Sequence, residues 1–400
     1  MLFAMQQNEG PLSRLRRDHE RLVLDLLRKQ GPMTRGELGG LCGLSRTTLY
    51  DIISALVASG AVVTSVPQSA HRGRGRPVER LTLNPQAGQA IGIDFARRAV
   101  HVAVVNVAHE IVGTASETHG SEMSEDKRVD VAQRLVGRLT GGALRLGALG
   151  AIGVGVVGPV GRPGEEAGLG HNGDTLAALV RERFEVPVLV DNNTRLAALA
   201  ESTWGAATGE QDVLYLRLSH GVGGGLVVGG ALHRGAEGLS GEFGHITVDP
   251  EGAPCGCGGT GCLETVASVG AVLGAYRAQG GRADDVPALI EAIASGDARA
   301  SSVVSEAGAR VGSVLAAVCN AIGPAVIVVG GELAALGRAL TEPVERALSA
   351  NILPVSRWRM SLRPAELGEA GAALGGIALV LHESPLLTHY PAESKPEEKA

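Results

Sequence analysis

The chain has 400 residues, of which 44% are hydrophobic and only 2% are aromatic. This length exceeds what a single core usually serves, so we expect two or three domains with cores of alanine, valine, leucine and isoleucine. No uninterrupted apolar run reaches the length of a membrane span, and residues 1–10 lack the features of a secretion signal. We therefore expect a cytoplasmic protein with no membrane partner.

Charge is divided unevenly along the chain. Residues 1–90 contain 12 Lys and Arg against 7 Asp and Glu, a net charge of +5. The remaining residues contain 24 against 35, a net charge of -11. A basic head on an acidic body predicts that only the head meets a polyanion such as DNA.

The first elements are two predicted helices. Residues 16–29 carry apolar side chains at helical spacing, and this helix should end before a Gly-Pro pair. Thr34 is a good N-cap for a short second helix, in which we expect Leu38 and Leu41 to point inward.

A third helix follows the turn at Gly43. Ser45 is its predicted N-cap, and it should run to about Ser59. Its predicted buried stripe is Leu49, Ile52, Ile53 and Leu56. The polar residues at its start, where a recognition helix contacts DNA, are Arg46, Thr47, Thr48 and Tyr50. A plain helical hairpin would give the same apolar stripe.

Two strands over residues 61–66 and 78–83 complete a predicted winged helix-turn-helix domain over residues 1–86. The segment between them alternates arginine with glycine, at Arg72, Arg74 and Arg76. Such a slim, extended, cationic wing suits a narrow minor groove, where the negative potential attracts guanidinium groups. The alternative interpretation is a solvated basic loop.

The rest of the chain reads as an α/β body. Predicted strands cover residues 91–95, 100–107, 110–114, 151–157 and 187–190. A predicted helix covers residues 174–184, and an apolar, glycine-rich helix covers 368–383. The end of the chain, residues 393–400, is charged and lacks large apolar residues, and we expect a disordered tail over residues 386–400.

The segment from Gly241 to Glu264 concentrates metal-binding side chains. Three cysteines lie among glycines with the spacing Cys-x-Cys-x4-Cys, and a histidine precedes them by ten residues: His245, Cys255, Cys257 and Cys262. One imidazole and three thiolates form a closed tetrahedral site for structural Zn²⁺. Buried thiols or a disulfide are the alternative, but clustered cysteines in a reducing compartment usually bind metal.

This segment resembles the signature of the ROK family, which comprises repressors and sugar kinases that share a sugar-binding domain. The resemblance rests on Glu242-Phe-Gly-His245 and on Cys255-Gly-Cys257-Gly-Gly-Thr-Gly-Cys262-Leu-Glu264. It implies an actin-like (ribonuclease H-like) ATPase-type domain over residues 87–385. This domain should have two lobes divided near residue 200, with the C-terminal helix returning to the first lobe.

The resemblance also implies the role of each site residue. His245 would bind zinc through one ring nitrogen and a sugar hydroxyl through the other, while Glu242 and Glu264 contact further hydroxyls. Asn192 matches the asparagine of the family that contacts the sugar. Asn193 stands where the kinases have the aspartate general base; an amide cannot accept that proton, although it can still hydrogen-bond the hydroxyl.

Both phosphate-binding loops of the kinases are altered here. The first reads Asp-x-Gly-Gly-Thr in the kinases, whereas Asp94 is followed by Phe-Ala-Arg-Arg. The second, normally Gly-Thr-Gly, resembles Ser219 to Gly225, in which histidine replaces the threonine or the threonine is shifted. We therefore predict that the protein is not an enzyme.

These features predict a sugar-responsive transcriptional regulator, with family bias towards repression of carbohydrate uptake and catabolism genes. Its expected partners are operator DNA, a sugar or sugar phosphate effector, and further copies in a homodimer or homotetramer. One alternative is a sugar kinase with a DNA-binding head. Another is a zinc-stabilised interaction module with neither ligand, against which the arginine-rich wing argues.

Overall fold

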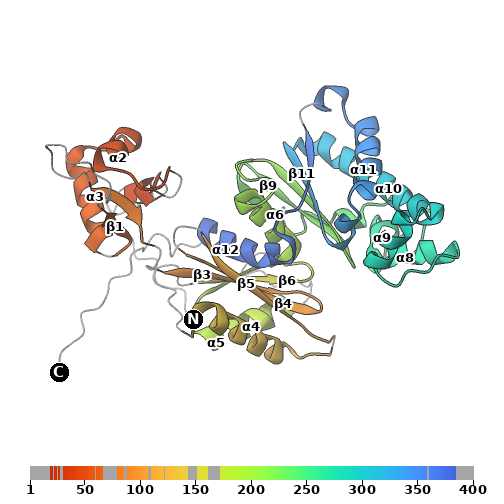
Figure 1. Cartoon of the computed structure of the whole chain (residues 1–400), viewed down its shortest axis with the longest axis horizontal. Helices are drawn as coiled ribbons and strands as arrows, with labels where there is room; N and C mark the ends of the chain where they lie inside the picture. Colours follow the sequence, from red (N-terminus) through yellow and green to blue (C-terminus); the bar gives the residue numbers. More distant parts are fainter. Residues whose placement is uncertain are drawn as a thin grey trace.

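The computed structural model of the chain describes residues 19–20, 22–24, 26–27, 30–58, 60–65, 79–84, 88–106, 110–120, 122–142, 151–160, 172–357 and 360–383. They form a small head and two lobes, each lobe built on a five-stranded sheet (Figure 1). The expected α/β class is confirmed.

The head contains helical residues between 19 and 30, α2 (Arg35–Cys42), α3 (Arg46–Ala58), β1 (Val62–Ser65) and β2 (Arg80–Leu83). A capping box begins α2: the Thr34 hydroxyl accepts the N–H of Glu37 at 3.2 Å, and Glu37 Oε2 accepts the N–H of Thr34 at 2.7 Å. The Ser45 hydroxyl accepts the N–H of Thr48 at 3.1 Å, so this predicted cap is confirmed.

The predicted stripe of α3 is buried as expected, at Leu49, Ile52, Ile53 and Leu56. The expectation that Leu41 points inward is wrong, because its side chain is 57% exposed. The contact of α2 with α3 is centred on Leu38 and Gly39, where an added Cβ would lie 3.4 Å from Leu49. Leu41 follows Leu38 by three residues and lies about 60° from it, on the side away from Gly39 and from this contact.

The first lobe is a sheet with strand order β5-β4-β3-β6-β7. Its strands are β3 (Gln89–Phe95), β4 (Ala99–Asn106), β5 (Ile111–Thr118), β6 (Ile152–Val156) and β7 (Val188–Asn192). The first three pair antiparallel, and β6 and β7 continue the sheet parallel to β3. The central strands are almost continuously buried because helices cover both faces of the sheet.

Three helices provide this cover: α4 (Glu125–Thr140) and α5 (Asn172–Phe184) lie on one face, and α12 (Gly371–Glu383) lies on the other (Figure 1). Glycines bring α12 unusually close to the sheet. A Cβ at Gly92 would lie 1.8 Å from the carbonyl oxygen of Ala373, and one at Gly153 would lie 1.9 Å from that of Gly376. The last described helix is thus fixed to the first lobe by backbone contact.

The second lobe has strand order β10-β9-β8-β11-β12. Its strands are β8 (Val213–Leu218), β9 (Val222–Val228), β10 (Ala231–His233), β11 (Val326–Gly330) and β12 (Ser361–Pro364). One face carries a large apolar core with α8 (Val269–Ala278), α9 (Val286–Ala294), α10 (Ala298–Ile322) and α11 (Arg338–Asn351). The other face packs on α6 (Asn193–Trp204), which joins the two sheets.

Among the described helices, α10 has the length and apolar composition of a membrane span. However, 61% of its most apolar window is buried inside the protein, against α8 and α11. The helices α2 and α3 reach this length and apolar composition only when they are taken together, as one span bent by 119°. Because α10 lines the core of the second lobe, its apolar composition is that of a core helix.

Candidate functional site

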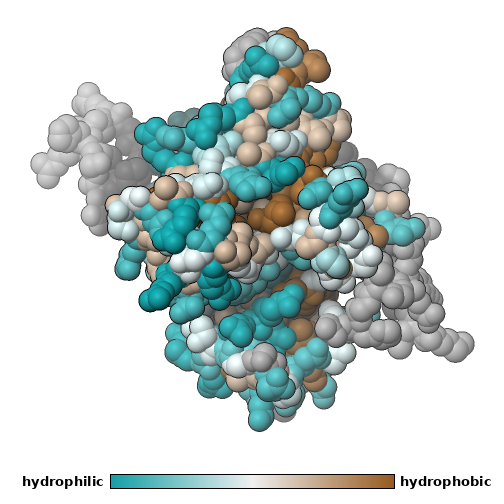
Figure 2. All heavy atoms as spheres, turned by 90° about the vertical axis from the view of Figure 1, so that its right-hand side faces the viewer, coloured by the Kyte–Doolittle hydropathy of each residue, from teal (hydrophilic) through white to brown (hydrophobic). Residues whose placement is uncertain are grey.

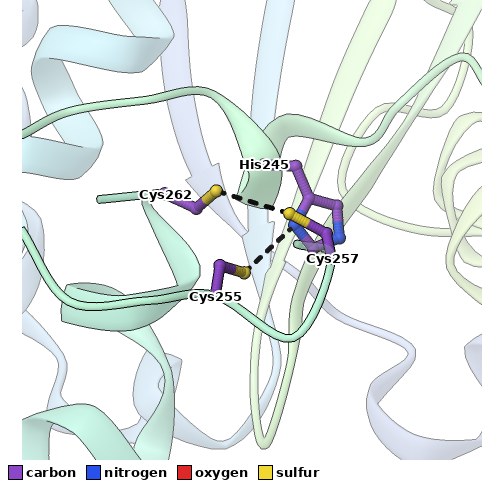
Figure 3. A group of neighbouring side chains, drawn as sticks. All are labelled: His245, Cys255, Cys257 and Cys262. Carbon is purple, nitrogen blue, oxygen red and sulfur yellow. Dashed lines mark hydrogen bonds between the residues drawn. The ribbon is translucent and has the colours of Figure 1, made fainter. Parts of the chain in front are cut away.

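The segment after β10 brings together the four predicted metal ligands, which we call the Cys/His cluster (Figure 3). His245 ends the short helix η2 (Phe243–His245), and the last cysteine of the cluster lies two residues before α7 (Glu264–Ala267). Backbone bridges between Thr247 and Cys262 and between Pro254 and Thr260 fold the loop back on itself. The fold therefore gathers ligands that are spread over the sequence.

The spacing within the Cys/His cluster suits a tetrahedral ion. All four ligand atoms lie within 4.8 Å of one another. Cys255 Sγ is 3.6 Å from His245 Nδ1, and Cys257 Sγ is 3.7 Å from Cys262 Sγ. Bonds of about 2.0 to 2.3 Å to a central Zn²⁺ would give a tetrahedron with edges of about 3.6 to 3.8 Å. The residues present therefore fit the ion.

Two glycines and one hydrogen bond shape this loop. Gly258 and Gly261 have φ values of +92° and +64°, and a Cβ at Gly261 would lie 1.5 Å from a backbone oxygen. The Gly259 N–H lies 3.4 Å from Cys257 Sγ and lowers the pKa of this thiol. Burial raises the pKa of Cys262 to about 12, so this thiol keeps its proton at neutral pH unless a cation displaces it.

The other side of His245 faces the predicted sugar ligands. Its Nε2 lies 4.0 Å from Glu242 Oε2, while Nδ1 faces the cysteines. Glu264 Oε2 accepts the N–H of Val222 at 2.9 Å, which holds the carboxylate at the start of β9. An imidazole that a metal would fix on one side, together with the carboxylates of Glu242 and Glu264, offers acceptors for hydroxyl groups.

The two predicted asparagines lie where β7 meets α6, and both already make hydrogen bonds within the chain. Asn192 caps α6 by accepting the N–H of Thr194 at 2.9 Å, and its Nδ2 donates to Gly158 O at 2.9 Å. Asn193 is only 5% exposed and hydrogen-bonds the buried carboxyl of Asp94, whose pKa is raised by burial. The protein thus encloses Asn193 almost fully and leaves little of its side chain open to a ligand.

Sequence reasoning missed a group of ionised side chains beside these asparagines, which we call the charge cluster: Asp191, Arg195 and Arg234. Asp191 Oδ1 accepts from Arg195 Nε at 2.7 Å, and its Oδ2 accepts from Arg234 Nε at 2.5 Å. Asp191 and Arg195 are each 1% exposed. Asp191 and Arg195 have the i, i+4 spacing of a helical ion pair, but Arg234 follows Asp191 by 43 residues, so no local signal could add it to the cluster.

Arg195 also connects loops from the two lobes. Its Nη2 donates to Val160 O at 3.0 Å, beyond β6, and its Nη1 donates to Gly238 O, in the segment that leads to Glu242. The guanidinium donors are thereby satisfied by one carboxylate and two carbonyls. A buried ion pair whose remaining donors are satisfied is stable, whereas removal of one partner leaves a buried charge.

The turn after β3 presents side chains where a phosphate-binding loop would present glycines. Phe95 is buried, and the Arg128 guanidinium lies 5.4 Å from the centre of its ring. Arg128 Nη2 also donates to Ala96 O at 2.8 Å, while Arg97 and Arg98 are exposed. Binding of phosphate by consecutive glycine amides is not available at this turn.

The second glycine-rich turn lies beside a cavity of about 480 Å³ between α8, α9 and η3 (Glu332–Leu336). Ser219 Oγ donates to Glu332 Oε1 at 2.8 Å, and His220 Nε2 lies 3.8 Å from the same oxygen. Figure 2 shows this side of the molecule, where apolar atoms gather near the centre of a mostly hydrophilic face. His220 thus lies close to the carboxylate that accepts the hydrogen bond of Ser219.

The head exposes the predicted recognition residues unequally. Arg46, Thr47 and Tyr50 are exposed, whereas Thr48 is half-buried and its hydroxyl lies 2.8 Å from that of Ser45. The wing residues Arg72, Arg74 and Arg76 lie outside the described residues.

A further side chain that sequence reasoning missed belongs to this surface. The Arg35 guanidinium, from α2, lies 5.3 Å from the centre of the Tyr50 ring. No periodicity or spacing in the sequence distinguishes Arg35 from an ordinary solvated residue.

Comparison with known proteins places these features in a family. The model of the ROK family matches residues 90–383. The xylose repressor of Bacillus spizizenii is 24% identical over 366 residues, which cover 91% of this chain and 94% of the repressor. The glucokinase of Halalkalibacterium halodurans is 33% identical over 318 residues, which cover 72% of this chain and 94% of the kinase.

A solved structure agrees with this assignment. The structure of a ROK family transcriptional regulator, described as a homologue of the E. coli MLC protein, superposes with a TM-score of 0.77 at 25% identity. The match covers 94% of this chain and 97% of that regulator, so it includes both the head and the lobes. Since the family model alone matches more than half of the chain, the protein belongs to the ROK family.

Proposed function

We propose that this chain is a sugar-responsive DNA-binding transcriptional regulator that represses genes of carbohydrate uptake or catabolism. The observation that carries the proposal is the extent of the similarity. Repressors match this chain over 91% of its length, whereas the glucokinase matches over 72%. A kinase has no use for a helix-turn-helix head, and a regulator needs both the head and a ligand site.

The Cys/His cluster would hold one structural Zn²⁺ per chain. The ion would deprotonate the thiols, close the loop and fix the ring of His245, whose Nε2 would then be the atom available to a ligand. The distances within the cluster support this assignment.

The effector would be a sugar or sugar phosphate held by Glu242, His245 and Glu264. The Glu264 carboxylate lies at the start of β9, where a Cβ at Gly221 would lie 3.1 Å from its Oε2. Asn192 would contribute from the end of β7 through the second N–H of its amide, and Asn193 would contribute from the start of α6. Glycine at position 221 keeps room for a ligand against this carboxylate.

DNA would be read by the head of a cytoplasmic homodimer or homotetramer. Arg46, Thr47, Thr48 and Tyr50 would select the operator, and Arg72, Arg74 and Arg76 would add salt-sensitive, A/T-leaning affinity. Selection of duplexes from a randomised pool by the full chain tests this: a two-fold symmetric half-site pattern supports the proposal, and recovery of no enriched sequence opposes it.

A sugar kinase with a DNA-binding head is the second candidate. Kinase chemistry would lack the general base at Asn193 and the first phosphate loop, and loss of a general base alone costs about 10²- to 10⁴-fold in rate. We expect no ATP-dependent phosphorylation of glucose, N-acetylglucosamine or xylose by the purified protein. Steady phosphate transfer that disappears in Asn193→Ala would favour the kinase.

A further inference from the structure

Arg35 occupies an unfavourable place in the head. It is the first residue of α2, directly after the N-cap Thr34, where the helix dipole is positive and disfavours a cation. Its Nη1 is buried and has no hydrogen-bond partner among the described residues. A neutral residue would avoid both costs, so the folded head by itself gives no reason for this guanidinium.

The Arg35 side chain is nevertheless held in place. Its guanidinium lies over the ring of Tyr50, 5.3 Å from the centroid, within the range of a cation–π contact. Tyr50 is 62% exposed on the same side of α3 as Arg46 and Thr47. The contact therefore adds a cation from α2 to the recognition surface of α3.

We propose that Arg35, positioned by Tyr50, binds a backbone phosphate of the DNA duplex. In a helix-turn-helix the second helix enters the major groove and the first crosses the sugar-phosphate backbone, which places the start of α2 beside a phosphate strand. A phosphate would accept from the part of the half-buried Arg35 side chain that solvent reaches and would neutralise the cation. The inference rests on the proposed DNA-binding function and adds a contact from a second helix.

Titration of a mixed-sequence 30-base-pair duplex with the full chain at several salt concentrations tests the proposal. For Arg35→Ala we expect affinity about tenfold lower. The slope of log K against log salt should become shallower by about 0.9 for each Arg35 that touches DNA. Arg35→Lys should keep most of the slope, and Tyr50→Ala should lose affinity with the slope retained, since the charge remains.

Arg338→Ala in α11 is the matched control, because it removes the same charge from an 89% exposed side chain far from the head. Its affinity and slope should equal those of the wild type. The thermal midpoint of Arg35→Ala should not fall, since a purely structural arginine would lower it.

If Arg35→Ala leaves affinity and slope unchanged while Arg46→Ala weakens binding, the proposed role of Arg35 is overturned. The proposed DNA-binding function is not affected by that result. Loss of affinity for only some duplex sequences would also overturn the role of Arg35, in favour of base reading. Absence of salt-dependent binding by the wild type would instead remove the proposed function itself.

Discussion

At the scale of single residues, the Cys/His cluster makes the most direct prediction. Cys257→Ser removes one of the four proposed ligands, so we expect loss of the one zinc proposed per chain and a lower thermal midpoint, because binding energy of a structural ion is folding energy. Elemental analysis of protein purified without chelators measures the first, and calorimetry the second. Cys42→Ser, which changes a thiol outside the cluster, should retain its zinc; an undiminished zinc content in Cys257→Ser would contradict the site.

The charge cluster gives a second prediction at this scale. Arg195→Met leaves the buried Asp191 with Arg234 alone and removes donors from two loops, so we expect a loss of about 3 to 5 kcal/mol in the free energy of unfolding. Urea denaturation measures this value. Arg338→Met, at an exposed ion pair on α11, should change it by less than about 1 kcal/mol. Equal effects of the two substitutions would mean that the cluster does not stabilise the site.

The two kinds of site residue differ in how far the sequence could predict them. The cysteines of the Cys/His cluster lie within eight positions of one another, so their spacing alone indicates a metal. Arg195 donates hydrogen bonds to the carbonyl of Gly238, 43 positions away, and to that of Val160, 35 positions away. Contacts of this kind depend on how β7, α6 and the following loop are brought together, which no local pattern encodes.

At the scale of elements, the contact between α12 and the first sheet depends on glycine. A Cβ at Gly153 in β6 would collide with the Gly376 carbonyl, so Gly153→Ala should displace α12 and lower stability by several kcal/mol, about as much as severe overpacking of a core. Gly137→Ala in α4 meets no atom within 4 Å and should stabilise the protein by about 0.5 to 1 kcal/mol. Thermal unfolding of the two variants should therefore shift in opposite directions, and a tolerated Gly153→Ala would refute the close contact.

The bounds of fully buried strands were predicted more closely than those of a half-exposed strand. The strands β3 and β6 lie within two residues of their predicted bounds, since both are buried along nearly their whole length. By contrast β5 is exposed at alternate positions and extends to Thr118, four residues beyond its predicted end. The helices α8 to α11 were not predicted, although α10 and α11 carry buried apolar residues at helical spacing.

At the scale of the whole molecule, the head and the ligand site lie in separate parts of the structure (Figure 1). Any effect of a sugar on DNA binding must therefore act through a change in the arrangement of these parts. The segment that ends at Glu242 is tied to the first lobe through Arg195, and α12 and α6 connect the two sheets. A ligand at Glu242 and Glu264 that draws the lobes together would alter the spacing of two heads in a dimer.

The measurement that tests this account most directly is operator affinity with and without effector, for the wild type and for Glu242→Ala. A thermal-shift screen of mono- and disaccharides and their phosphates would first identify the effector, and the selected duplex would serve as operator. For the wild type we expect a 5- to 150-fold change, about 1 to 3 kcal/mol of coupling, with DNA changing sugar affinity by the same factor. Glu242→Ala should bind the operator normally and ignore the effector, whereas Glu251→Ala, an exposed carboxylate nearby, should respond like the wild type. A Glu242→Ala variant that responds at wild-type effector concentrations would contradict the account.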